Sequence, residues 1–185
     1  MADKKKDEKK DEVQAEQQGE AAKDEVQAEQ QGGATDENQK RISIVKVYVK
    51  DFSFESPKAP AIFNSGEWSP KTNLNLRSSH SQVDGNLHEV VLTITVDAKE
   101  GEETIFLVEL HQAGLFEISG YPEDEKGAII GSFCPNILFP YARESIASII
   151  QKGGFPEFVL QPINFDALYM QSKAQQVEAS LAEKH

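Results

Sequence analysis

Cysteine, basic charge and long hydrophobic runs are all scarce in this sequence. Cys134 is the single cysteine among 185 residues, which excludes an internal disulfide and a cysteine-rich metal site. The 19 Lys and Arg residues are outnumbered by 31 Asp and Glu residues, for a formal charge of −12, and this disfavours nucleic-acid binding because phosphate contacts need clustered cations. No run approaches the roughly 18 apolar residues of a membrane span, and no apolar signal segment follows Met1. We therefore expect a protein of the reducing cytoplasm.

The first 40 residues lack every aromatic residue, leucine and isoleucine. They also repeat themselves, because KDEVQAEQQG occurs at Lys10–Gly19 and again at Lys23–Gly32. Such a segment cannot bury enough apolar surface to offset the entropy lost on ordering, and two copies are too few for a repeat domain. We expect residues 1–40 to form a disordered charged tail.

Residues 42–120 show the two-residue hydrophobic period of half-buried strands. Turn sequences at 84–86 and 99–101 divide the later part of this region, and Leu74 and Leu76 share one face of the strand before them. The alternation on the last two strands predicts one inward row, made of Val90, Leu92, Ile94, Val96, Phe106, Val108 and Leu110. It also predicts an outward row, made of Glu89, Thr93, Thr95, Asp97, Leu107, Glu109 and His111.

The strand that starts near Ile42 is less regular in composition. If it alternates strictly, Tyr48 lies on the same face as Phe52 and Phe54, and the opposite face carries Asp51 and Glu55. Its later part then has an aromatic face and an acidic face. Together with the three following strands it predicts a four-stranded antiparallel sheet with one apolar side.

Residues 134–154 read as one long helix with both ends marked. We expect it to begin between Asn136 and Pro140, where a proline is tolerated in a first turn, and to end near Lys152 before two glycines. Its apolar stripe consists of Leu138, Ala142, Ile146, Ile149 and Ile150. A neighbouring strip carries hydroxyls, from Tyr141, Ser145 and Ser148, and we expect this strip to contact a second copy of the chain.

A proline-containing stretch, residues 155–163, predicts an extended loop before a second helix. Asn164 is a good N-cap, and Phe165 and Tyr169 then lie on one helical face. Past Gln171 the chain becomes polar and can extend the helix only marginally. The expected fold class is α+β, with a four-stranded antiparallel sheet and two C-terminal helices packed on one face.

Enzymatic chemistry finds no support in the sequence. His80 and His88 flank a hairpin and can approach each other, but they lack a third ligand for zinc. Cys134 lies in an apolar setting that favours a packed thiol over a nucleophile. Phosphate-loop, nucleophile-elbow and dinucleotide motifs are missing. We expect no enzyme activity, no metal and no cofactor.

Several longer motifs carry a family resemblance. They are VKDFSFESPKAP at Val49–Pro60, an isolated Trp68, GEETIFLVEL at Gly101–Leu110, CPNILFPYARE at Cys134–Glu144, and GGFPEFVLQPINFDALYM ending at Met170. In this order they resemble the bacterial protein-export chaperone family SecB. The resemblance implies a domain at residues 41–170, followed by a polar tail at 171–185. It further implies a homotetramer, a dimer of dimers joined through the long helices, that holds unfolded secretory precursors without ATP and delivers them to the SecA motor.

The resemblance also implies two binding surfaces. The client groove would use Phe63, Trp68, Leu74, Leu76, Phe155, Phe158, Phe165 and Tyr169. Contact with the basic, zinc-bearing tail of SecA would use Asp51, Glu55, Leu107 and Glu109. Composition alone favours simpler interpretations of both sets: the apolar residues as ordinary core residues, and the acidic residues as part of a solvated sheet face. Two other functions remain open: a SecB-like chaperone that controls a toxin–antitoxin pair, and an adaptor that recruits SecA without binding clients.

Overall fold

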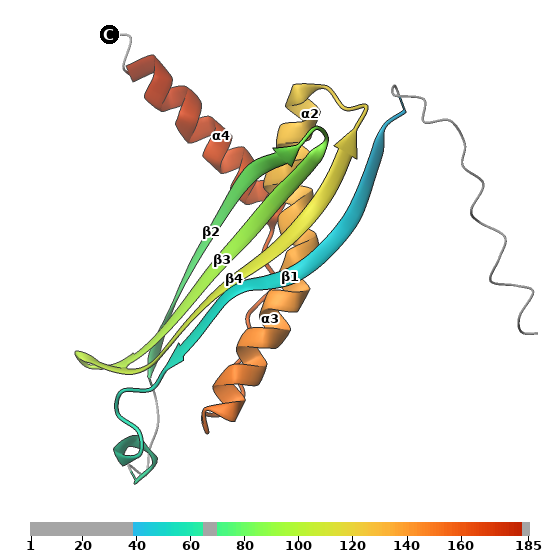
Figure 1. Ribbon diagram of the computed structural model, residues 1–185. Coiled ribbons are helices and arrows are strands. Elements are labelled where there is room, and N and C mark those ends of the chain that lie inside the picture. The colour runs from blue at the N-terminus through green and yellow to red at the C-terminus, as the bar shows by residue number, and fades with distance from the viewer. Residues whose placement is uncertain (1–38, 65–69, 183–185) are drawn as a thin grey trace, which may run out of the picture. The chain divides into compact units, whose positions relative to one another are not determined.

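The computed structural model describes residues 39–64 and 70–182 (Figure 1). Most of the expected tail at 1–40, and Trp68, lie outside the described residues. The elements in chain order are strand β1 (Arg41–Glu55), the short 3-10 helix η1 (Ala61–Asn64), strands β2 (Lys71–Asp84), β3 (Leu87–Glu100) and β4 (Glu103–Ser119), helix α2 (Glu123–Ala128), the π-helical segment η2 (Ile129–Phe133), and helices α3 (Cys134–Lys152) and α4 (Phe165–Ala182).

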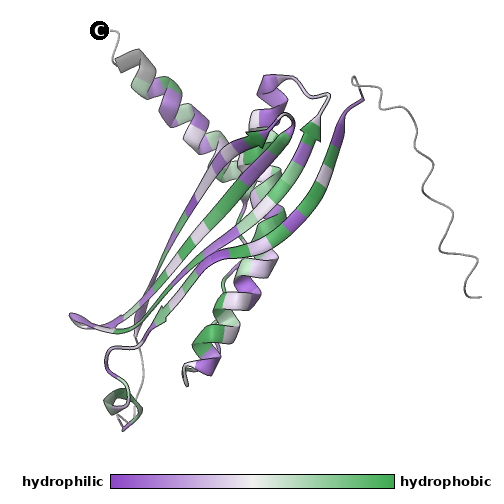
Figure 2. Cartoon of the chain, in the orientation of Figure 1, coloured by the Kyte–Doolittle hydropathy of each residue, from purple (hydrophilic) through white to green (hydrophobic). Residues whose placement is uncertain are grey.

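The four strands form one antiparallel sheet in the order β1-β4-β3-β2. The two predicted hairpin turns are confirmed, with Gly85 at φ 47° and Gly101 at φ 61°, a region that glycine enters without a side-chain clash. The inward row predicted on β3 and β4 is buried on the side that α3 covers. Figure 2 shows the resulting alternation of hydrophobic and hydrophilic residues along the strands.

Strand β1 departs from strict alternation at two bulges. Its pairing with β4 shifts between Ile44 and Lys46 and again between Val49 and Asp51. Each bulge adds one residue and reverses the side to which later side chains point. The prediction that Tyr48 shares a face with Phe52 is therefore wrong: Tyr48 lies on the outer face and donates a hydrogen bond to Glu89. The later part of the strand follows the prediction, because the acids and the phenylalanines lie on opposite faces.

The long helix begins earlier than the sequence indicated. Helical structure runs without a break from Glu123 through η2 and α3 to Lys152, so Pro140 lies inside a helix and the predicted start at Asn136–Pro140 is wrong. Tertiary packing overrides the local preference here, because Leu138 and Phe139, just before the proline, are buried in the core. The predicted apolar stripe is confirmed: four of its members are fully buried and Ile149 packs against them, the buried ones being Leu138, Ala142, Ile146 and Ile150.

Helix α4 begins as the sequence predicted and continues further. Residues 155–164 have no regular structure, and the Asn164 side-chain oxygen accepts a hydrogen bond from the Ala167 amide at 3.0 Å. The helix then runs to Ala182, well past Gln171. Among its residues up to Ala179, Phe165 alone is buried, and the helix packs on η2 instead of on the strands. The α+β fold class is confirmed, with α3 as the helix that covers the sheet.

This marginal packing makes α4 sensitive to its cap. We expect Asn164→Ala to destabilise α4 by about 1 kcal/mol, because the Ala167 amide loses its acceptor. Hydrogen exchange should report faster opening of α4 amides and unchanged protection of α3. Asn164→Asp keeps an acceptor oxygen and serves as the matched control. Equal exchange rates in the alanine variant and the wild type would show that the cap does not hold the helix.

Candidate functional site

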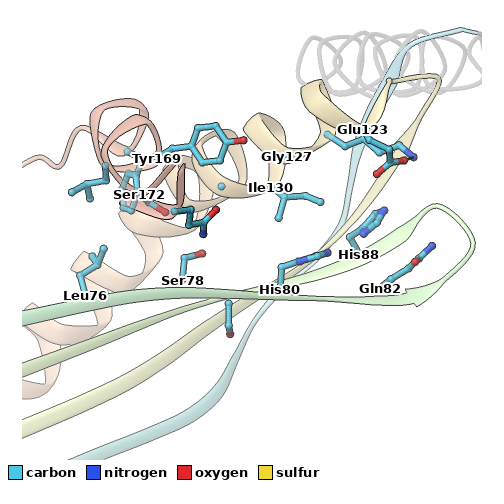
Figure 3. A pocket seen from close by; sticks show the side chains of 16 residues that line it. Leu76, Ser78, His80, Gln82, His88, Glu123, Gly127, Ile130, Tyr169 and Ser172 are labelled. Carbon is cyan, nitrogen blue, oxygen red and sulfur yellow. Dashed lines mark hydrogen bonds and ion pairs between the residues drawn. The ribbon is translucent and has the colours of Figure 1, made fainter. Parts of the chain in front are cut away.

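A groove of about 790 Å³ lies between the inner face of β2 and β3 and the segments α2, η2 and α4 (Figure 3). One end is apolar, where Leu76 on the sheet faces Phe165, Leu168 and Tyr169 of α4. The other end is polar and is lined by Ser78, His80, Gln82, His88, Glu123 and Lys126. Because α4 supplies Phe165, Leu168 and Tyr169, the apolar end of the groove is complete only when α4 is docked.

Two glycines one helical turn apart explain how α4 docks. A Cβ atom added to Gly131 would lie 2.4 Å from Cδ2 of Tyr169, and one added to Gly127 would lie 2.9 Å from the Tyr169 hydroxyl. The aromatic ring therefore lies directly against the helix backbone. Phe165 completes the contact by packing edge-on against Phe139 at 5.7 Å between ring centroids. The Ser132 hydroxyl also donates a hydrogen bond to the Asp166 carboxylate.

The structure does not bring all the residues predicted for the client groove into one groove. Leu76, Phe165 and Tyr169 line the groove. Leu74 is 47% exposed and borders a shallow depression that also touches Leu107 on the outer face.

Two of the other aromatic members, Phe63 and Phe155, lie together just past the end of α3. Phe155 is buried there between Phe106, 5.0 Å away, and Phe63, 5.5 Å away between ring centroids. Phe63 is half exposed, and Phe158 packs partly against the core. Phe63 and Phe155 therefore belong to a second aromatic cluster, and none of Phe63, Phe155 and Phe158 lines the groove.

The acidic residues expected to bind SecA share the outer face. In the β1–β4 register, Asp51 lies opposite His111, and Glu55 lies opposite Leu107. Glu109 occupies the position between His111 and Leu107, and its carboxylate is 3.2 Å from His111 Nε2. The helices lie on the other side of the sheet (Figure 1), so this face is uncovered in the described part of the chain. The structure therefore places Glu55 and Glu109 beside the partly exposed Leu107, and Asp51 further along the same face.

A separate polar cluster occupies the same face further along. The Lys50 ammonium lies 2.7 Å from the Glu89 carboxylate. The hydrogen bond from Lys50, together with the one from Tyr48, lowers the pKa of the Glu89 carboxyl group. The hydrogen bond to Glu89, with burial, raises the pKa of Tyr48 to about 12. These groups satisfy one another, so they add no free charge to the acidic surface.

Cys134 belongs to the core, and His80 and His88 line the groove. Burial raises the pKa of Cys134 to about 12, so its thiol stays protonated and is a packed group, as predicted. The rings of His80 and His88 approach to 5.7 Å between centroids, which confirms the predicted proximity. In residues 39–64 and 70–182, His, Cys, Asp and Glu form no group of three that could hold a metal ion.

The polar end of the groove is the part of the site that sequence reasoning missed. His80 and His88 were considered only as weak metal ligands, and Glu123 and Lys126 fell in a segment for which no helix was expected. The spacing of Gly127 and Gly131 was an available signal, since glycines one turn apart let another element approach a helix closely.

The hydroxyl strip of α3 is open in the single chain. Tyr141 is 54% exposed, and Ser145 and Ser148 are partly exposed. The strip adjoins the buried stripe that packs on the sheet. The expected self-contact at this strip remains a prediction.

No helix within the described residues combines the length and apolarity needed to cross a membrane.

Comparison with known proteins places the chain. The family model described as preprotein translocase subunit SecB matches residues 35–176. A protein-export protein SecB of Nitrosococcus oceani is 53% identical over 146 residues, which are 78% of this chain and 89% of that protein. The SecB protein of Methylococcus capsulatus is 53% identical over 140 residues, or 74% of this chain and 90% of that protein.

A solved structure supports the fold. The SecB-like chaperone of Mycobacterium tuberculosis, in complex with an antitoxin peptide, superposes with a TM-score of 0.56 over 66% of this chain and 91% of that chain. At 16% sequence identity this likeness concerns the fold alone. The family match and the identity to curated relatives agree with the motifs read from the sequence, and the chain therefore belongs to the SecB family of protein-export chaperones.

Proposed function

We propose that this protein holds unfolded precursors in the groove between β2 and α4, without ATP, and passes them to SecA at the outer face of the sheet in the cytoplasm. The observation that carries the proposal is the position of the two surfaces. Leu76 and Tyr169 lie on the inner side of the sheet, and Asp51 and Glu109 lie on the outer side. A client and a motor can therefore be bound at once.

The groove suits a chain without folded structure. Its apolar end offers contact area to the apolar side chains that unfolded proteins expose. Strand β2 is at the edge of the sheet, so its backbone groups can pair with an extended segment whatever the sequence of that segment. Weak contacts of this kind at several grooves let a holding chaperone bind many clients and exchange them quickly.

The outer face suits a basic partner. Glu55 and Glu109 lie beside Leu107, and Asp51 lies further along the same face, which no described helix covers. This surface combines negative charge with a small apolar contact. The formal charge of −12 adds long-range attraction for cationic segments. The basic tail of SecA is the partner that this chemistry and the family favour.

Assembly as a dimer of dimers follows from α3 in this proposal. One side of the helix is used by the sheet, and the strip of Tyr141, Ser145 and Ser148 beside it is open to a second copy. Four chains would bring several grooves within reach of one client, which raises avidity without any tighter single contact.

The export role is preferred to control of a toxin–antitoxin pair. The relatives at 53% identity are named protein-export proteins, whereas the chaperone solved with an antitoxin peptide is only 16% identical. A pure adaptor would not need the apolar wall that Leu76, Phe165 and Leu168 provide.

Native mass spectrometry tests the proposal directly. The free protein should give four times the chain mass of 20.5 kDa, and a reduced, unfolded secretory protein should add to that mass. The same secretory protein in its folded, oxidised form is the control and should not bind. A monomer mass at micromolar concentration would refute the assembly, and equal binding of the folded form would refute the chaperone activity.

A further inference from the structure

A lysine lies beside the carboxylates of the outer face. The pairing of β1 with β4 shifts between Val49 and Asp51, so Lys50 is the additional residue of a bulge. Its ammonium group contacts Glu89 on the outer face, and the next residue, Asp51, lies on the same face. A cation at this place opposes the attraction that Asp51 offers to a basic partner.

The Lys50 side chain is directed to Glu89. Its ammonium nitrogen lies 2.7 Å from Oε2 and 3.0 Å from Oε1 of Glu89, so it contacts both carboxylate oxygens. Lys50 belongs to β1 and Glu89 to β3, with β4 between them, and two strand spacings are about 10 Å. The lysine is therefore extended across β4. Among the described residues, no cation forms an ion pair with Asp51.

The Glu89 carboxylate is itself held in place. Tyr48 donates a hydrogen bond to it, and the Glu89 side chain is only 15% exposed. The hydrogen bonds from Lys50 and Tyr48 lower the pKa of Glu89, so the carboxylate stays ionised at neutral pH. A fixed anion of this kind restricts a long lysine side chain that otherwise samples many rotamers.

We propose that Glu89 is a positioning residue that sequesters Lys50 and so keeps Asp51 available to the basic partner. This role rests on the proposed function, because it concerns the surface that binds the SecA tail. When Glu89 is replaced by a neutral residue, the Lys50 ammonium loses its partner and can turn to the carboxylate of the next residue. The released lysine then neutralises Asp51 and repels the cations of SecA.

A purely structural role of the ion pair predicts a different sign. If the pair only held β1 in place, removal of either partner would disturb the outer face and weaken binding. Sequestration predicts opposite effects, because Glu89→Gln releases the cation whereas Lys50→Met removes it. Glutamine and methionine are close in size to the residues they replace, so packing changes little.

Surface plasmon resonance with the zinc-loaded SecA tail and the full-length assembled protein, at about 0.1 M salt, measures these effects. We expect Glu89→Gln to weaken binding by about fivefold and Lys50→Met to strengthen it by about twofold, the range of exposed charge pairs. In a Lys50→Met background, Glu89→Gln should weaken binding by less than about twofold, because no lysine is left to release.

Two variants of the same face control for net charge. Glu117→Gln and Lys46→Met make the same charge changes at positions that the β1–β4 register places on the outer face. Lys46 is five residues from Asp51, or roughly 15 Å along the strand, which exceeds the screening length of about 10 Å at 0.1 M salt. Both control variants should bind the SecA tail nearly as well as the wild type.

The outcomes separate the positioning role from the proposed function. Equal weakening by Glu89→Gln in both backgrounds would overturn the sequestration of Lys50 and leave the SecA surface standing. Weaker binding by Lys50→Met would do the same, and it needs no Glu89 variant that folds. A gain in Lys46→Met equal to that in Lys50→Met would also overturn the sequestration. Failure of the wild type to bind the SecA tail would overturn the proposed function, and the positioning role with it.

Discussion

Glu109→Lys is expected to weaken binding of SecA by about tenfold or more at low salt, since reversing a charge inside a complementary surface replaces attraction with repulsion. Glu109 lies between Asp51 and Glu55 across the β1–β4 pair, so the added lysine would face the partner's cations. The wild-type interaction should lose affinity steeply with salt, because exposed charges are screened within about 10 Å at 0.1 M. Surface plasmon resonance against the SecA tail at two salt concentrations measures both effects.

Glu117→Lys is the matched control for this variant. It makes the same charge change on the same strand, and the outer face holds both positions. Eight residues separate them, or about 27 Å along the strand, which exceeds the screening length. The control should therefore bind SecA nearly as well as the wild type. An equal loss in the two variants would show that net charge, and not this surface, governs the interaction.

The reciprocal change removes apolar area from the groove. Leu76→Ala with Tyr169→Ala should lower the capture of unfolded protein on the order of tenfold, at roughly 25 cal/mol for each Å² of lost apolar contact, and should leave SecA binding intact. Combination with Glu109→Lys should give both defects and no new one, because distant substitutions add. Loss of client capture in Glu109→Lys alone, in a folded assembly, would place the acidic face inside the client groove and contradict the two-surface interpretation.

Gly131→Ala is expected to undock α4 and reduce client capture by about tenfold, on the same scale of lost apolar contact. The new methyl group would lie 2.4 Å from Tyr169 Cδ2, well inside van der Waals contact, so the ring must leave the helix backbone. An alanine in a helix otherwise stabilises by up to about 1 kcal/mol relative to glycine. Helix propensity therefore cannot explain a loss of stability in this variant, and a destabilised α4 would be due to the clash with Tyr169. Hydrogen exchange of α4 amides and binding of an unfolded protein are the measurements.

Two further variants control for Gly131→Ala. Gly127→Ala meets only the Tyr169 hydroxyl, at 2.9 Å, and the end of a side chain can move, so its effect should be smaller. Gly131→Ala with Tyr169→Ala removes the clashing ring, and the stability of α4 should then depend on the two sites in a non-additive way. Full α4 protection in Gly131→Ala alone would show that Tyr169 does not pack against this glycine.

Local periodicity determined much of this protein before any coordinates were considered. The inward rows of β3 and β4, the hairpin at Gly85, the loop at 155–163 and the Asn164 cap were all predicted and are all present. Each depends on residues within a few positions of one another, since alternation, turn chemistry and capping are local properties of the chain. The acidic outer face could be predicted for the same reason, because alternation alone separates Glu109 from Val108.

Tertiary structure decided the rest. Nothing local indicates that β1 pairs with β4, the last strand in sequence, or that two bulges turn Tyr48 outward. The interior Pro140 depends on the burial of Leu138 and Phe139 in the core, which outweighs local helix preference. The groove is the clearest case. His80, Glu123 and Tyr169 come from three distant segments, and they meet only because the glycines of the α2–η2 helix let α4 approach its backbone.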